Sequence, residues 1–87
     1  PGDRLGHAMR GHAYLHRGQP GDPERARDAY SEGMKHAPNA YLFPHQRGLA
    51  RSQLGDAEGA LADHGLALSL QSDYVPALLA RSRLLNA

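Results

Sequence analysis

Three histidines are the residues of this chain whose type and spacing could support metal chemistry. His12 and His16 are four residues apart, which puts both on one face of a helix, and His45 would approach them from a neighbouring helix. Neutral imidazoles bind zinc or nickel, but the chain has no cysteine, and no carboxylate is expected beside them as a fourth ligand. We therefore predict no native metal site and keep a histidine metal site as an alternative.

Residues for covalent or acid–base catalysis lack the context that such catalysis needs. No serine has the surroundings of a nucleophile elbow, no glycine-rich phosphate loop follows a strand, and no pair of carboxylates shares an expected pocket. We predict that the chain is not an enzyme and needs no cofactor; a regulatory domain of a larger enzyme is the alternative. The serines considered are Ser31, Ser52, Ser69, Ser72 and Ser82.

The composition argues against several classes of partner. Ten basic and nine acidic residues in 87 give a net charge of +1, too little to attract nucleic acid or an anionic membrane. No apolar run approaches the roughly 20 residues that cross a bilayer, and the sequence lacks a signal-peptide pattern. We expect a soluble, cytoplasmic protein, although a chain without cysteine carries no information about its redox compartment.

Regularly spaced breaks divide the chain into five segments that favour helix. Each is rich in Ala, Leu and Arg, whereas Val75 is the only valine and isoleucine is absent. Pro44 and Pro76 must lie in first helical turns. The expected N-caps are Asp22, Asp56 and either Ser72 or Asp73. The predicted helices are 4–17, 23–36, 41–53, 57–70 and 74–86.

Positions 34 residues apart match one another along the chain, as Gly33 and Ala67 do. In this pattern the chain resembles the tetratricopeptide repeat (TPR), a helix-turn-helix unit of about 34 residues. The first unit has the residues typical of the family at Gly11, Tyr14, Gly18, Ala26, Tyr30, Gly33, Met34 and Pro38, and the second at Gly48, Gly55, Ala60, Ala67 and Leu68.

The resemblance implies an all-α fold, a right-handed α-α superhelix (a TPR-like solenoid) of five antiparallel helices in one domain. Because the third unit has only its first helix, we expect the chain to be a piece of a longer protein. The first unit covers about 4–40 with a three-residue insert near 19–22, the second about 41–74, and the half repeat 75–87.

Small residues allow the two helices of a pair to approach closely, so we expect Gly11 to contact Tyr30. In the second unit His64 stands where the family has Tyr or Phe, and Asp63 is expected to face solvent. An arginine recurs once per unit, at Arg10, Arg47 and Arg81. We predict that the aliphatic part of each side chain covers the packed helices while its guanidinium stays in water. The alternative is that the three arginines form a row that binds anions.

The resemblance also implies a concave groove lined by the first helices of successive units. About half of the surface formed by the matching positions is apolar. This composition predicts a non-catalytic protein-interaction scaffold that binds a peptide or a helix in the groove. The predicted groove residues are Leu5, Met9, His12, Leu15, His16, His45, Gln46, Leu49, Gln53, Leu79 and Arg83.

Some members of the family hold the C-terminal carboxylate of heat-shock chaperones in a clamp of cationic and amide side chains. At the positions of the cationic clamp residues this chain has Ala8, Pro76 and Ala80, and at the positions of the clamp asparagines it has His12 and Gln46. The charge-assisted hydrogen bonds of the clamp cannot form with these residues, so we predict that the chain does not capture chaperone tails in this way.

Self-assembly is the alternative function from a different class. The third unit lacks a second helix, so Leu78 and Leu85 are expected to face an uncovered side and to form the interface of a homo-oligomer.

Overall fold

Five helices make up the part of the chain that the computed structural model describes, residues 4–86. They agree with the predicted helices to within one residue at each end. The helices are α1 (Arg4–Arg17), α2 (Asp22–His36), α3 (Leu42–Gln53), α4 (Ala57–Leu70) and α5 (Val75–Leu85). Side chains are described throughout this range except at Arg4, Leu5, His7, Ala8, Leu15 and His16.

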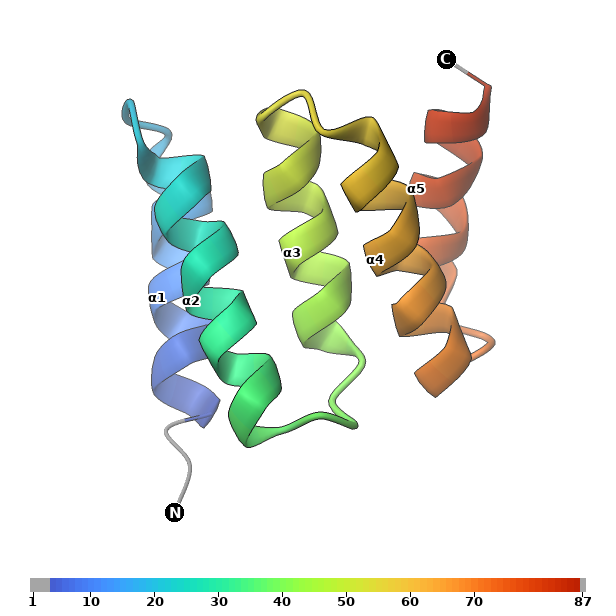
Figure 1. Cartoon of the computed structure of the whole chain (residues 1–87), viewed down its shortest axis with the longest axis horizontal. Coiled ribbons are helices and arrows are strands. Elements are labelled where there is room, and N and C mark those ends of the chain that lie inside the picture. Colours follow the sequence, from blue (N-terminus) through green and yellow to red (C-terminus); the bar gives the residue numbers. More distant parts are fainter. Residues whose placement is uncertain (1–3, 87) are drawn as a thin grey trace.

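Consecutive helices run antiparallel, and each packs on the next along the chain (Figure 1). In addition, α1 contacts α3, while α2 and α4 lie in front of α1 and α5 in Figure 1. The first helices of the hairpins, α1, α3 and α5, therefore form one layer, and the second helices, α2 and α4, form the other. The described residues contain no strand, and the predicted all-α solenoid is confirmed.

Within each hairpin an aromatic ring lies directly on a glycine. A Cβ added to Gly11 would lie 2.5 to 2.8 Å from ring atoms of Tyr30, and one added to Gly48 would lie 2.8 to 3.2 Å from ring atoms of His64. No real Cβ fits at the shorter of these distances, so the two helices reach this spacing only because the opposing residue has no side chain. The predicted contact between Gly11 and Tyr30 is confirmed.

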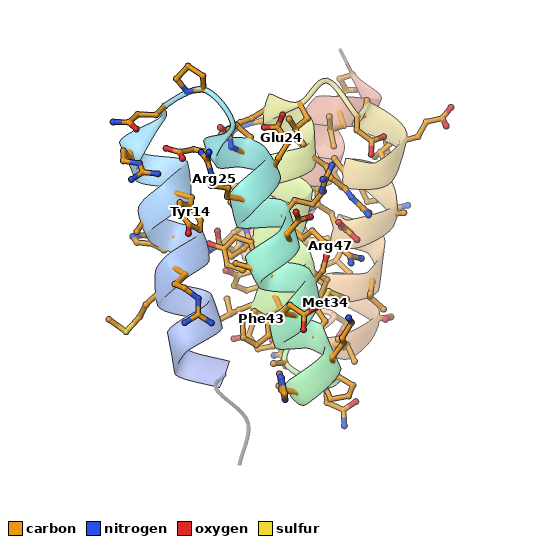
Figure 2. All side chains as sticks on the ribbon, turned by 60° about the vertical axis from the view of Figure 1, so that its left-hand side comes forward. Tyr14, Glu24, Arg25, Met34, Phe43 and Arg47 are labelled. Carbon is orange, nitrogen blue, oxygen red and sulfur yellow. The ribbon has the colours of Figure 1, made fainter. Side chains whose placement is uncertain are left out.

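The same kind of contact joins one hairpin to the next. A Cβ on Gly33 would lie 2.6 to 2.9 Å from ring atoms of Phe43, which places this ring directly on α2. Phe43 and Tyr30 are buried beside Ala26 and Ala50. These four side chains form the centre of the core, and Tyr14 and Met34 pack against it, as can be followed in Figure 2.

Of the three predicted helix N-caps, one is confirmed and two are wrong. Asp56 caps α4 as expected, because its carboxylate accepts a hydrogen bond from the Gly59 amide at 2.9 Å. The prediction for Asp22 is wrong: α2 begins at Asp22 itself, after Gly21 at a φ of 85°. The prediction for α5 is also wrong, since Tyr74 is the N-cap and makes no side-chain cap bond.

The Asp22 carboxylate closes the turn between α1 and α2 instead of capping. It accepts hydrogen bonds from the Arg17 guanidinium at 2.7 and 2.8 Å and from the Gln19 amide at 2.9 Å. Arg25 adds a third partner at 3.0 Å. Hydrogen bonding to Arg17, more than any other contact, holds the pKa of Asp22 well below its ordinary value. The turn that carries the predicted insert is thus tied to both flanking helices.

We predict that Gly11→Ala lowers the free energy of unfolding. The added methyl overlaps the Tyr30 ring, and the overpacking cost of about 1–3 kcal/mol exceeds the gain in helix propensity of about 1 kcal/mol. Gly65→Ala is the matched control, because nothing lies within 4 Å of a Cβ at that helical position; it should raise stability by about 1 kcal/mol. Urea denaturation of both variants measures the difference, and a stabilising effect of Gly11→Ala would contradict the prediction.

Candidate functional site

Most of the predicted groove residues with described side chains lie on the surface of the first helices. On α1, Met9 is 63% exposed and His12 is also exposed. On α5, Leu79 is 52% exposed beside an exposed Arg83. The predicted residues Leu5, Leu15 and His16 fall outside the described side chains. We call the following set the first-helix surface: Met9, His12, Gln46, Leu49, Gln53, Leu79 and Arg83.

Helical spacing places these residues in stripes along their helices. Gln46, Leu49 and Gln53 follow one another at intervals of three and four residues on α3, so they share one face. Leu49 and Gln46 are half-buried and Gln53 is exposed. Each stripe combines an apolar side chain with a neighbouring hydrogen-bonding group, a pattern that suits recognition of a peptide with apolar anchors.

Charge is divided between the two layers of the solenoid. The helices α1, α3 and α5 contain three, two and two arginines and no acidic residue. In contrast, α2 and α4 contain four and two acidic residues, and α2 also has three basic residues, so the net charge of these two helices is −3. The net charge of +1 therefore conceals a basic first-helix layer and an acidic second-helix layer. A ligand that meets the first-helix surface encounters no carboxylate from the helices that form it.

Two of these arginines are held by a buried carboxylate between α3 and α4. Arg47 forms a two-pronged ion pair with Asp63 at 2.7 and 2.9 Å, and Arg51 contacts the same carboxylate at 3.1 Å. Arg47 also donates to the Ser31 hydroxyl of α2 at 3.2 Å, and Figure 2 shows it between α2 and α4. The expectations that Asp63 and the charged end of Arg47 face solvent are wrong, because each is the partner of the other.

His45 is buried rather than exposed on the first-helix surface, because α4 brings a second histidine against it. Its side chain is only 4% exposed, and its Nδ1 lies 3.1 Å from Nδ1 of His64, which is fully buried. Burial, reinforced by the neighbouring His64, lowers the pKa of His45 to about 4. Burial also lowers the pKa of His64, although the charge of Asp63 opposes this shift. Both rings are therefore neutral at pH 7.

The structure separates the histidines that were considered for metal binding. His12 is exposed on α1, whereas His45 is enclosed between α3 and α4, and the side chain of His16 lies outside the described set. Among the described residues, no group of three His, Cys, Asp or Glu side chains could hold a metal ion.

The histidine pair and the Asp63 cluster were both missed by sequence reasoning. For the pair a signal was present: His64 stands one repeat after Tyr30, and Gly48 opposes it as Gly11 opposes Tyr30. This register predicts burial of the ring at position 64. For Asp63 the sequence held no comparable signal, because its two arginine partners are 12 and 16 residues away.

A scan against protein-family models and a search of curated proteins found no match to this chain. Solved structures do match. The TPR2B domain of yeast Sti1, in a complex with pHsp70, aligns with a TM-score of 0.87 at 23% identity. The first TPR domain of Spaghetti (RPAP3), bound to the HSP90 peptide SRMEEVD, aligns with a TM-score of 0.86 at 27% identity. The chain has a TPR-like fold.

Both alignments cover 93% of this chain, which accounts for about two and a half TPR-like repeats. The chain spans 62% and 63% of the two matched chains. Counted as TPR-like repeats, the hairpins α1–α2 and α3–α4 are complete, and α5 corresponds to the first helix of a third repeat. None of the described helices is both long and apolar enough to cross a bilayer.

We predict that Asp63→Asn destabilises the TPR-like fold by about 3 kcal/mol, because it leaves two largely buried guanidinium groups without their carboxylate. Asp28→Asn is the matched control: Asp28 pairs with Arg27 at the surface, and its loss should cost less than about 1 kcal/mol. Thermal unfolding followed by circular dichroism gives both values. Equal destabilisation by the two substitutions would show that the buried cluster contributes no more than a surface pair.

Proposed function

We propose that the chain is a non-catalytic scaffold that binds a peptide across the first-helix surface. The observation that carries this proposal is the combination of exposed apolar side chains, such as Met9 and Leu79, with a helix layer that contains arginines and no acidic residue. Both matched TPR structures contain a chaperone-derived ligand, which supports a peptide or protein as the class of partner.

The chemistry of the surface indicates which peptides fit. Leu49 and Leu79 offer apolar contact area, and burying an apolar peptide side chain against each contributes about 1.5–3 kcal/mol. Gln46 and Gln53 can orient the peptide backbone through hydrogen bonds. Arg83, exposed beside Leu79, attracts a carboxylate. We therefore propose an acidic peptide with at least two apolar residues as the ligand.

The ligand is not proposed to be held by its terminal carboxylate. The cationic places of the chaperone clamp on α5 are occupied by Pro76 and Ala80, which have no donor to offer from their side chains. His12 is exposed at one of the asparagine places. A chaperone tail could thus contact this surface only through its acidic and apolar side chains.

A peptide-library screen tests the proposal. Selected sequences should be enriched in Asp, Glu and apolar residues, and Leu49→Asp or Arg83→Glu should weaken their binding by about tenfold or more, since each loses roughly 1.4 kcal/mol or more of contact energy. Leu66→Asp, which changes an exposed leucine of α4 in the other layer, is the matched control and should leave affinity unchanged. Hits that bind the Leu49 and Leu66 variants equally well would refute the proposed site.

The peptide SRMEEVD tests the absence of a clamp. Its affinity should change less than about twofold when the terminal carboxylate is amidated, because Pro76 and Ala80 offer no cationic group at the clamp positions of α5. Fluorescence anisotropy with the two labelled peptides measures the ratio. A tenfold or greater loss on amidation would show that the chain captures terminal carboxylates by other residues.

A second candidate function is self-association through α5. Leu78 is 43% exposed and Leu85 is 62% exposed on this helix. We propose that these apolar side chains pack against a second copy of the chain. Sedimentation equilibrium should then give a mass that rises with concentration, and Leu78→Glu should return it to the monomer value. A monomer mass at every concentration would exclude this function.

A further inference from the structure

The buried histidine pair lies where three helices meet. His45 belongs to α3 and His64 to α4, and their Nδ1 atoms are 3.1 Å apart. The ring of Tyr74, the residue directly before α5, stands edge-on to His45 at 5.1 Å and 89°. Tyr74 also packs edge-on against Tyr41 at 4.8 Å, just before α3. The start of α5 is therefore anchored on the histidine pair and on one tyrosine.

The distance between the two rings requires that they share one proton, with one Nδ1 donating and the other accepting. His64 is the donor, because its Nε2 is buried against Gly48 with no hydrogen-bond partner. An unpartnered lone pair at that place costs less than an unpartnered N–H group. His45 therefore accepts through Nδ1 and carries its own proton on Nε2.

Neither ring can take a further proton without loss. A proton on Nδ1 of His45 replaces the acceptor by a second N–H and breaks the bond. A proton on Nε2 of His64 places a charged N–H against Gly48, where no acceptor is present. A proton on both rings puts two positive charges 3.1 Å apart in a buried site.

The other charged groups around the pair do not remove this penalty. From α4, Asp63 lies next to His64 and favours its protonated form, but Arg47 and Arg51 of α3 already neutralise that carboxylate. The side chain that α2 brings to this cluster is the uncharged Ser31 hydroxyl, which faces Arg47. Before α5, Tyr74 is neutral, and burial raises the pKa of its phenol further.

We propose that the His45–His64 pair is an acid-sensitive latch, which holds α5 against the α3–α4 hairpin when both rings are neutral and releases it when either ring is protonated. Protonation of His45 at Nδ1 breaks the shared hydrogen bond, and protonation of His64 at Nε2 leaves a buried charge on an N–H without an acceptor. Either cost favours an open form in which the protonated ring reaches water and the ring of Tyr74 loses the surface on which it packs. The first hairpin has Tyr30 at the place of His64, so the side chains described in α1 and α2 contain no counterpart of this histidine pair.

Proton linkage determines the direction in which pH shifts the equilibrium between the closed and open forms, and the pH range of this shift. An open form exposes His45 to water, where its pKa is about 6.5, and the closed form holds that pKa at about 4. The open form therefore binds more protons, and the closed form loses stability as pH falls from about 6.5 toward about 4. Between about pH 7.5 and about pH 5, this difference favours opening by roughly 30-fold. The carboxylate of Asp22 stays ionised across that range, because hydrogen bonding to Arg17 holds its pKa well below the ordinary value.

Amide hydrogen exchange on the whole chain tests the latch. After correction for intrinsic exchange rates, protection of α5 should fall roughly 30-fold from about pH 7.5 to about pH 5, while protection of α2 changes less than about threefold. The variant His45→Leu with His64→Phe replaces both rings by apolar side chains and should remove this pH dependence. His36→Gln, which changes an exposed histidine of α2, is the matched control and should keep it.

Histidine titration by NMR on the unaltered chain gives an independent reading that does not depend on the folding of any variant. Titration of His45 well below pH 6 supports the latch. Titration of both His45 and His64 at or above about pH 6.5 would overturn it, because the closed form would then bind protons as readily as the open form. Equal loss of protection in α5 and α2, or an unchanged pH dependence in the double variant, would also overturn it.

Discussion

The architecture depends on rings packed directly onto glycines. Each time one helix meets the next along α1 to α4, a ring lies on a residue without a side chain: Tyr30 on Gly11, Phe43 on Gly33 and His64 on Gly48. These contacts set the separation of the helices and hence the relative placement of α1, α3 and α5. Because the first-helix surface is assembled from those three helices, its geometry is a consequence of glycine positions on α1, α2 and α3 that lie outside this surface.

Polar interactions inside this framework determine which helices are tied together. The Asp63 carboxylate gathers two arginines of α3, and one of those arginines reaches back to α2. Burying an ion pair contributes less to stability than its distances suggest, because both groups lose their hydration. Its main effect is on specificity: an α4 displaced by one residue would separate Arg47 from the Asp63 carboxylate. The cluster therefore defines the register of the second hairpin.

Local sequence signals predicted the helices well, and the errors arise where a side chain pairs with a residue outside its own helix. Gly, Pro and Asp mark helix ends within a few residues, so the five helices and the Asp56 cap could be recognised directly. The repeat register also predicted the contact between Gly11 and Tyr30. In contrast, Asp22, Asp63 and His45 were assigned by local rules to a cap, to solvent and to a groove. Their actual positions depend on Arg17, Arg47 and His64, each of which belongs to a neighbouring helix.

The separation of charge between the layers gives the molecule an electric dipole directed across the solenoid. Seven arginines lie in the helices of one layer, and the helices of the other contain six acidic and three basic residues, although part of this charge is joined in ion pairs. Such a dipole turns the basic layer toward an approaching anionic molecule before any contact forms. Added salt would shorten the range of this orienting field to about 8 Å at physiological ionic strength. The chain is thus nearly neutral in total charge, yet its two sides differ in how they meet a charged partner.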